Sequence, residues 1–459
     1  MRATHDTSPR DPQAGVLHRV LREHLETFLA ARASADPEGV GLPPFVTNEL
    51  RAFLRCGVLA HGAARFRCDD CRRDRLVALS CKGRGFCPRC GGRRMTDLAG
   101  HLVSRVFPEV RVRQWVLTLP FGLRYRAAYD HSLALAIWRV AVRVIDRWYR
   151  RSVRCPAGAR LQGGSVTAIH RFGGDLRLNL HFHGVFLDGA FALAPGRAPR
   201  FVPVAAPAPG EMEALLAKIV TRVERLLARR DGGASEAAGQ EGPLAHTLTR
   251  SVLSRGASKL GPDEDPHVTL VPERERRKAR LGGFDLDATV AVSPRRRDRL
   301  EQLCRYILRP PFSASRLRAM PDGRIVLALR HPWPDGTTHV AYEPDTFLER
   351  LASLVPRPRA NTLLYHGILA GHASHRARAL PGPPGPPRRR NTAWADLMRK
   401  SFGLDVLSCR DCGGRMRYVA ALIERSGLAR ALRAHGYRCE ALPIRPARPP
   451  PGPAEHDWT

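Results

Sequence analysis

The sequence lacks any long apolar run, any amphipathic membrane anchor and any secretion signal. A bilayer-spanning helix needs about 20 consecutive apolar residues, and a secretion signal needs a short apolar stretch near the start of the chain. These absences exclude an integral membrane protein. We therefore expect a soluble, cytoplasmic protein.

Acidic residues are scarce relative to basic ones. The chain of 459 residues has 43 Asp and Glu against 75 Lys and Arg, a formal net charge of +32 and a pI near 11.1. Such a charge attracts a polyanion, most often nucleic acid. A basic protein of the membrane surface is the competing interpretation, but the missing anchor disfavours it. We expect DNA as the partner and a location with the nucleoid.

Aromatic side chains are also few, at 7% of the residues. Proteins that hold single-stranded nucleic acid often stack its bases on aromatic rings. Such stacking should therefore be limited to a few positions, for example Trp115, Tyr125 and Trp333.

The eleven cysteines fall partly in Cys-x2-Cys pairs, which in a large chain without a secretion signal indicate metal sites rather than disulfides. Two pairs separated by fifteen residues predict one tetrahedral zinc site, as in a zinc ribbon; they are Cys68, Cys71, Cys87 and Cys90. Cys81 is a candidate additional ligand and so is His61, although a buried thiol and a surface imidazole are equally compatible with the pattern. Cys409 and Cys412 supply half of a second site, which Cys439 and His435 could complete; the alternative is a turn without metal.

Residues 176–189, LRLNLHFHGVFLDG, alternate apolar and polar side chains as a β-strand does. Alternate residues of a strand point to the same side, so His181 and His183 should project together and could bind one cation. A pair of hydrogen-bonded histidines on a polar sheet face is the alternative. Together with strands at 110–120 and 164–174 and a helix at 131–151, this strand predicts an antiparallel sheet with helices on one face, an α+β fold.

A single tyrosine, Tyr306, lies in SPRRRDRLEQLCRYILRPP, a predicted helix of about four turns. Ser293 is the expected N-cap and Pro294 the first helical residue. The helix should end at Arg309, because a residue before proline avoids the helical region. A half-buried tyrosine without chemical function is the alternative interpretation of Tyr306.

These stretches resemble the HUH (His-hydrophobic-His) nucleases and, more narrowly, the rolling-circle transposases of the insertion-sequence-91 family. The fragments that carry the resemblance occur in a specific order and are RFRCDDCRRDRLVALSCKGRGFCPRCGGRRM (65–95), RQWVLTLPFGLRY (113–125), IHRFGGDLRLNLHFHGVFLDG (169–189), RYILRPPFSASRL (305–317), HPWPDGTTHV (331–340) and CRDCGGRMR (409–417). The resemblance implies a zinc-binding region at 1–108, an HUH catalytic domain at 109–356 and, at 357–459, a proline-rich linker with a C-terminal Cys-x2-Cys tail. In the HUH fold the histidine pair lies on a central strand and the tyrosine helix crosses above it.

The resemblance also implies an activity, namely nicking of single-stranded DNA at the ends of a mobile element, followed by rejoining. Tyr306 would be the nucleophile and form a 5′-phosphotyrosine, while His181 and His183 would hold Mg²⁺ or Mn²⁺. The third metal ligand stays open among Gln302, Glu301 and His170. Arginines near both motifs are expected to contact DNA: Arg84, Arg93, Arg94, Arg305, Arg309 and Arg316.

Many relatives carry a second tyrosine four residues before the first, where this chain has Gln302. The chain therefore resembles the single-tyrosine branch, and a homodimer could supply a second Tyr306. A plasmid replication or mobilisation nickase would use the same histidines and tyrosine. A zinc protein that binds DNA without cleaving it is the other alternative.

Overall fold

The computed structural model describes residues 11–154, 159–231, 257–260, 277–380, 395–396, 398–399, 403 and 405–449. The proline-rich linker predicted at 381–390 lies outside these residues. Across the described ranges, no helix is both long and apolar enough to cross a membrane.

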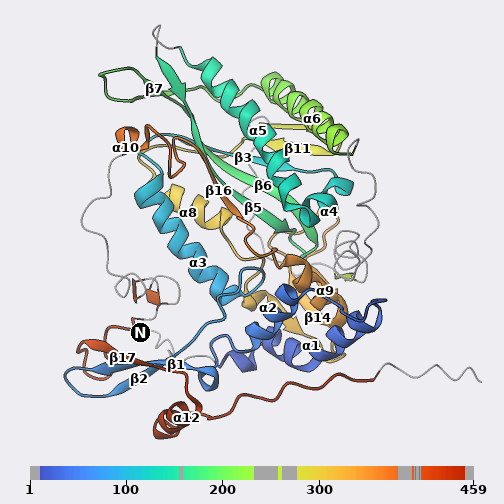
Figure 1. The fold of residues 1–459 in the computed structure, drawn as a ribbon, viewed down its shortest axis with the longest axis vertical. Coiled ribbons are helices and arrows are strands. Elements are labelled where there is room, and N and C mark those ends of the chain that lie inside the picture. Colours follow the sequence, from blue (N-terminus) through green and yellow to red (C-terminus); the bar gives the residue numbers. More distant parts are fainter. Residues whose placement is uncertain are drawn as a thin grey trace, which may run out of the picture.

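A seven-stranded antiparallel sheet lies at the centre of the molecule (Figure 1), with the order β10-β11-β3-β6-β5-β16 and with β12 paired to β3. Its strands are β3 (Val112–Thr118), β5 (Gly164–Phe172), β6 (Leu178–Leu187), β10 (Lys278–Leu281), β11 (Phe284–Asp287), β12 (Ala291–Val292) and β16 (Leu363–Gly367). The strands predicted at 164–174 and 176–189 are confirmed as β5 and β6, which pair antiparallel. A small sheet adjoins it, made of β4 (Arg160–Gln162), β7 (Gly189–Leu193) and β8 (Arg200–Pro203).

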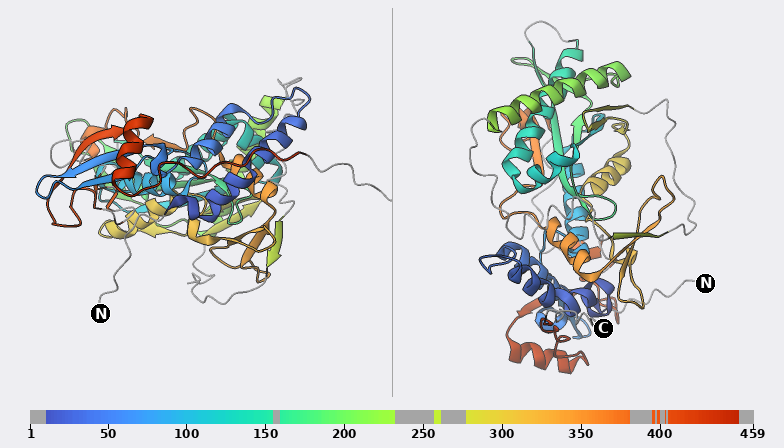
Figure 2. Two further views of the ribbon diagram at one scale, coloured as in Figure 1. Left: turned by 90° about the horizontal axis from the view of Figure 1, so that it is seen from below. Right: turned by 90° about the vertical axis from the view of Figure 1, so that its right-hand side faces the viewer.

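Helices cover both faces of the central sheet (Figures 1 and 2), so the predicted α+β class is confirmed but the expectation of one covered face is wrong. One face packs against α4 (Phe121–Tyr129), α5 (His131–Ser152) and α6 (Pro209–Asp231). The other packs against α3 (Pro88–His101), the π-helical turn Leu102–Val106, α8 (Arg297–Ile307) and the short α10 (Arg376–Ala379). The reason lies in β6, where Leu180 and Phe182 are buried on the first face and Val185 and Leu187 on the second.

The tyrosine helix, α8, is shorter than predicted. Ser293 does not cap it, since the backbone NH of Arg296 donates to the Ser293 carbonyl at 3.1 Å in a separate turn. The helix begins at Arg297 and ends at Ile307. Its buried residues recur at helical spacing and face the sheet: Leu300, Leu303, Cys304 and Ile307.

A second core joins the start of the chain to residues that follow α8. It holds α1 (Val16–Ser34), α2 (Pro44–Leu54), α9 (Pro344–Leu354), β13 (Leu317–Ala319), β14 (Ile325–Ala328) and β15 (His339–Tyr342). These three strands form a four-stranded sheet with β9 (Ala257–Leu260), which pairs with β15. The apolar side chains of α1 recur at helical spacing and are buried here, including Leu21, Leu25 and Phe28.

A third unit combines both ends of the described chain. The hairpin β1 (Ala63–Cys68) and β2 (Asp74–Ala78) pairs through β1 with β17 (Met416–Leu422), and α12 (Arg425–Ala434) packs beside them (Figure 1). Division of the chain at 108 and 356 stays a prediction. The packing crosses both boundaries, because β16 belongs to the central sheet and β17 to the N-terminal hairpin.

Candidate functional site

Three histidines gather on the face of the central sheet that α8 covers. His181 and His183 alternate along β6, and His170 lies on β5 directly opposite His181. One ring nitrogen from each of the three lies within 4.8 Å of the others. The predicted same-side projection of His181 and His183 agrees with this arrangement, and His170 completes a triad.

Each ring of the triad is oriented by one hydrogen bond. His181 donates through Nδ1 to the Asn179 carbonyl at 2.9 Å, and His170 donates through Nε2 to the Ile307 carbonyl at 2.6 Å. The remaining nitrogen of each ring, Nε2 of His181 and Nδ1 of His170, then carries a lone pair. His170 Nδ1 is buried without a hydrogen-bond partner.

His183 contacts Gln114 of β3, with 2.8 Å between His183 Nδ1 and the Gln114 side-chain nitrogen Nε2. A carboxamide can present either its NH2 or its oxygen. When the oxygen faces the ring it accepts Nδ1–H, and His183 Nε2 carries the lone pair. That Nε2 atom is buried and has no partner, so with the Gln114 amide turned to this orientation the triad offers a metal ion three neutral donors.

Burial keeps the three imidazoles uncharged. Removal from water lowers the pKa of His181 to about 4. The same effect lowers the pKa of His170 and that of His183 well below the ordinary histidine value. A neutral imidazole is the form that binds metal, and a hydrogen-bonded second nitrogen is typical of metal-ligating histidines. The donor set therefore fits a divalent cation.

Tyr306 stands beside the triad in the last turn of α8. Its ring meets the His183 ring edge-on, with 5.7 Å between centroids, and the side chain is 43% exposed. The guanidinium carbon of Arg309 lies 4.1 Å from the Tyr306 ring centroid. An open cavity of about 740 Å³ borders Tyr306, Gln114 and Gln302, so a ligand can approach the hydroxyl.

Gln302 and Glu301, the other third-ligand candidates, do not join the triad. The Gln302 side-chain oxygen accepts from Arg299 at 3.2 Å, and Glu301 pairs with Arg305 at 2.8 Å. Gln302 lies four residues before Tyr306, which places it about 6 Å further along the helix axis. Of the three candidates, His170 is the one whose ring lies with those of His181 and His183.

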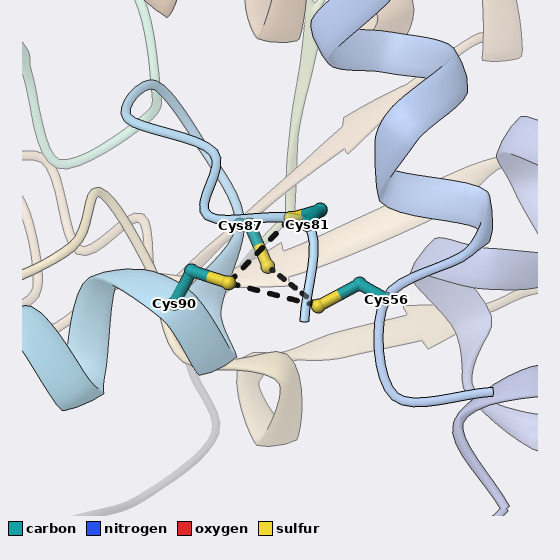
Figure 3. A group of neighbouring side chains, drawn as sticks. All are labelled: Cys56, Cys81, Cys87 and Cys90. Atoms are coloured by element: carbon teal, nitrogen blue, oxygen red, sulfur yellow. Dashed lines mark hydrogen bonds between the residues drawn. The ribbon is translucent and has the colours of Figure 1, made fainter. Parts of the chain in front are cut away.

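Four cysteines form a compact cluster where α2 and α3 meet (Figure 3): Cys56, Cys81, Cys87 and Cys90. Their sulfur atoms lie 3.5 Å apart for Cys81 and Cys90, 3.6 Å for Cys56 and Cys87, and 3.7 Å for Cys56 and Cys90. Zinc bonded to four sulfurs at about 2.3 Å needs sulfurs roughly 3.8 Å apart, so this set can hold zinc. Cys81 belongs to it, as does Cys56, which is not part of any Cys-x2-Cys pair.

The predicted zinc set is therefore corrected. Cys87 and Cys90 join Cys56 and Cys81, while Cys68 and Cys71 lie with Cys409 and Cys412 instead. The expectation that Cys439 and His435 complete the C-terminal pair is also wrong, since Cys439 donates to the Ala429 carbonyl. Spacing predicts each Cys-x2-Cys turn but not which turns come together in three dimensions.

The arginines predicted to contact DNA near the first cluster serve the fold as well. They donate to neighbouring groups: Arg84 to the Ala360 carbonyl, Arg93 to Ser80 Oγ at 3.0 Å and Arg94 to the Gly83 carbonyl at 3.1 Å. Such bonds occupy part of each guanidinium, which keeps further donors for a phosphate.

Near Tyr306 the predicted arginines differ from one another. Arg305 is paired with Glu301, whereas Arg316 donates to the Ala328 carbonyl at 2.6 Å and burial lowers its pKa to about 10. Of these three arginines, Arg309 lies next to the triad, with its guanidinium over the Tyr306 ring.

Of the three aromatic residues expected to stack on bases, Trp115 cannot do so. It is fully buried, and its indole NH donates to Tyr149 Oη at 3.0 Å. Tyr125 instead stacks on Tyr129, and Trp333 lies under the guanidinium of Arg177.

Two family models match the chain. Residues 20–119 match the family described as "Transposase zinc-binding domain", and residues 164–377 match the one described as "Putative transposase". No curated protein and no solved structure matches the chain. The first match contains the Cys56 cluster and the second contains the histidine triad and Tyr306. The protein is thus a zinc-binding, DNA-processing enzyme, and the chain belongs to the insertion-sequence-91 family of transposases, with the zinc-binding domain of that family in its N-terminal part.

Proposed function

We propose that this transposase nicks single-stranded DNA with Tyr306 and later rejoins the strand, as rolling-circle transposition requires. The observation that carries the proposal is the contact between Tyr306 and His183, on the sheet face where three neutral histidines converge. A nucleophile and a set of metal donors then act on the same phosphate. A plasmid nickase would share this chemistry, but the transposase matches favour transposition.

The reaction conserves the energy of the phosphodiester. The Tyr306 oxygen attacks the phosphorus and loses its proton, while the bond from phosphorus to the 3′ oxygen breaks and that oxygen gains a proton. The products are a 5′-phosphotyrosine and a free 3′-OH. Attack by a 3′-OH on the phosphotyrosine reverses the step and joins a new strand without an external energy source.

The residues around Tyr306 suit this step. His170, His181 and His183 would hold Mg²⁺ or Mn²⁺, which when bound supplies positive charge to offset the charge that develops on the phosphate. Gln114, Asn179 and Ile307 orient the three rings through the hydrogen bonds described above. Arg309 adds a fixed positive charge beside Tyr306, positioned to attract the scissile phosphate.

One chain offers one nucleophile at this site. Gln302 stands one turn before Tyr306, and an amide cannot form the phosphodiester link. A single chain should therefore hold one covalent 5′ end at a time, so strand exchange uses either the same tyrosine twice or a second subunit.

The proposal is tested by covalent capture of a single-stranded oligonucleotide bearing an element end, in Mn²⁺. Wild-type protein should form an adduct on Tyr306, located by mass spectrometry, and Tyr306→Phe should form none while still binding DNA. Tyr437→Phe is a matched control, because Tyr437 is similarly exposed (40% against 43%) and lies in the C-terminal unit. An adduct on Tyr306→Phe, or two strands on one chain, would refute the single-tyrosine mechanism.

A further inference from the structure

A second group of four cysteines lies outside the site described above and joins distant parts of the chain. It consists of Cys68, the last residue of β1, Cys71 in the turn before β2, and Cys409 and Cys412, which precede β17. The sulfurs of Cys68 and Cys412 are 3.5 Å apart and those of Cys71 and Cys409 are 3.6 Å apart. Cys409 and Cys412 lie beyond both family matches, which end at residues 119 and 377.

We infer that these four thiols bind a second structural zinc ion, which fastens the C-terminal strand β17 to the N-terminal hairpin. The four sulfurs all lie within 4.8 Å of one another, and the pairs across the group approach the roughly 3.8 Å that tetrahedral zinc–thiolate geometry requires. A disulfide would bring two of them to about 2.05 Å, and all four cysteines are free.

The turns that carry the cysteines are shaped for metal binding. The backbone NH of Gly414 points to Cys412 Sγ at 3.4 Å, as the NH of Gly83 points to Cys81 Sγ at 3.4 Å in the first cluster. Such bonds stabilise a thiolate, since a donor to the charged form favours ionisation. A Cβ on Gly414 would lie 2.1 Å from the Asp70 carboxylate and 3.1 Å from Cys412 Sγ, so the two turns approach each other closely at this glycine.

Apolar packing around the group is too small to hold β17 alone. Among the residues that the structure describes, the buried cluster beside it has four members, two of them cysteines of the group, with Ala64 and Val77 partly buried against them: Phe66, Cys68, Cys409 and Met416. Along β17 Met416 is buried, whereas Tyr418 is 48% exposed and Val419 is 45% exposed. Units with so little core commonly depend on a metal or disulfide, and zinc binding contributes directly to folding.

Ion pairs between the two turns are weak at this exposure. Arg73 lies 3.5 Å from Asp411, and Arg417 lies 3.4 Å from Asp69, with at least two-fifths of every one of these side chains exposed. Exposed pairs contribute about 0–1 kcal/mol each. They help to bring the turns together but do not replace the metal. This inference is independent of the Tyr306 mechanism, because it concerns another end of the molecule.

The test is the zinc and iron content of the full-length protein, purified under reducing conditions and measured by elemental analysis. Cys412→Ser should contain one zinc atom per chain fewer than wild type, since the exposed Cys412 is a ligand of the second site only. Cys439→Ser, a thiol outside both clusters, is the matched control and should lose none. Unchanged zinc in Cys412→Ser, or iron in place of zinc, would overturn the inference.

A second measurement does not depend on the variant folding. Wild-type protein stripped of metal and titrated with Co²⁺ should show thiolate charge-transfer absorption that saturates at two equivalents; saturation at one would overturn the inference. Where Cys412→Ser does fold, hydrogen exchange of the β17 amides should be faster than in wild type, with α5 unchanged. If the β17 amides exchange at the same rate with and without the zinc ion, then the ion does not hold β17 to the hairpin.

Discussion

The Gln114 side chain determines which nitrogen of His183 is available to a metal. Its amide lies 2.8 Å from His183 Nδ1 on the buried face of the sheet. Gln114→Leu should lower Mn²⁺ affinity about 10- to 100-fold, the usual effect of removing a partner behind a metal-ligating histidine. Gln114→Glu should retain affinity, because a carboxylate also accepts Nδ1–H. Isothermal titration with Mn²⁺ measures both, and equal affinity in Gln114→Leu and wild type would remove Gln114 from this role.

Metal titration should show whether His170 or Gln302 supplies the third metal ligand. His170 belongs to the triad, whereas the Gln302 amide is bound to Arg299. His170→Ala should weaken Mn²⁺ binding at least 10-fold, as expected for loss of a ligand rather than of a group behind one, and should slow adduct formation. Gln302→Ala should bind Mn²⁺ as wild type does. The reverse pattern would mean that the helix, not β5, supplies the third ligand.

How much of the site could be predicted depended on how local its geometry is. His181 and His183 were predictable because a strand of any register turns alternate side chains to one side. His170 stayed one of three candidates, since it meets His181 only through the β5–β6 register, which the turn and packing set together. The partners of the Cys-x2-Cys turns were predicted wrongly for the same reason, as Cys68 and Cys412 are 344 residues apart.

At the scale of elements, the position of β6 depends on Gly184, between His183 and Val185. A Cβ at Gly184 would lie 2.7 Å from atoms of both the Phe186 and the Trp138 rings. The Trp138 side chain of α5 cannot move aside easily, because it is fully buried and its indole NH donates to Thr167 Oγ1 at 2.9 Å. The close approach of α5 to the strand therefore requires glycine.

Gly184→Ala should lower the free energy of unfolding by about 1–3 kcal/mol, the usual cost of overpacking a core, and should slow adduct formation by displacing His183. Gly174→Ala is the control, since a Cβ there would meet no atom within 4 Å. Urea denaturation measures the first effect and single-turnover capture the second. Equal stability of the two variants would show that α5 moves away without cost.

The prediction of secondary structure was better inside elements than at their ends. The apolar spacing in α5 was read correctly, with Trp138 and Ile145 fully buried. The start of α8 was misplaced by about one turn, because Ser293 belongs to a turn rather than a cap. The expectation of helices on one face was wrong because β6 buries apolar residues on both sides.

For the whole molecule, the net charge of +32 should dominate binding to DNA. The logarithm of the association constant for a single-stranded oligonucleotide should fall linearly with the logarithm of salt concentration, by about 0.7 for each phosphate neutralised. A slope of roughly −3.5 would thus mean about five phosphates. Fluorescence anisotropy with Tyr306→Phe measures binding without cleavage. A slope near zero would mean that the basic surface does not contact the DNA backbone.

The pairing of β1 with β17 also has a consequence for synthesis on the ribosome. The cysteines of the two turns are 338 to 344 residues apart. At a synthesis rate of about 5–20 residues per second, the ribosome therefore completes β17 about 15–70 s after the β1–β2 hairpin. During that time one edge of β1 is open, and an open edge invites pairing with another nascent chain. Arg65 and Arg67 of β1 are both paired with Asp74 of β2, and charged side chains on an edge strand discourage such pairing. A late frameshift in the gene would therefore leave the earliest-made hairpin without its partner.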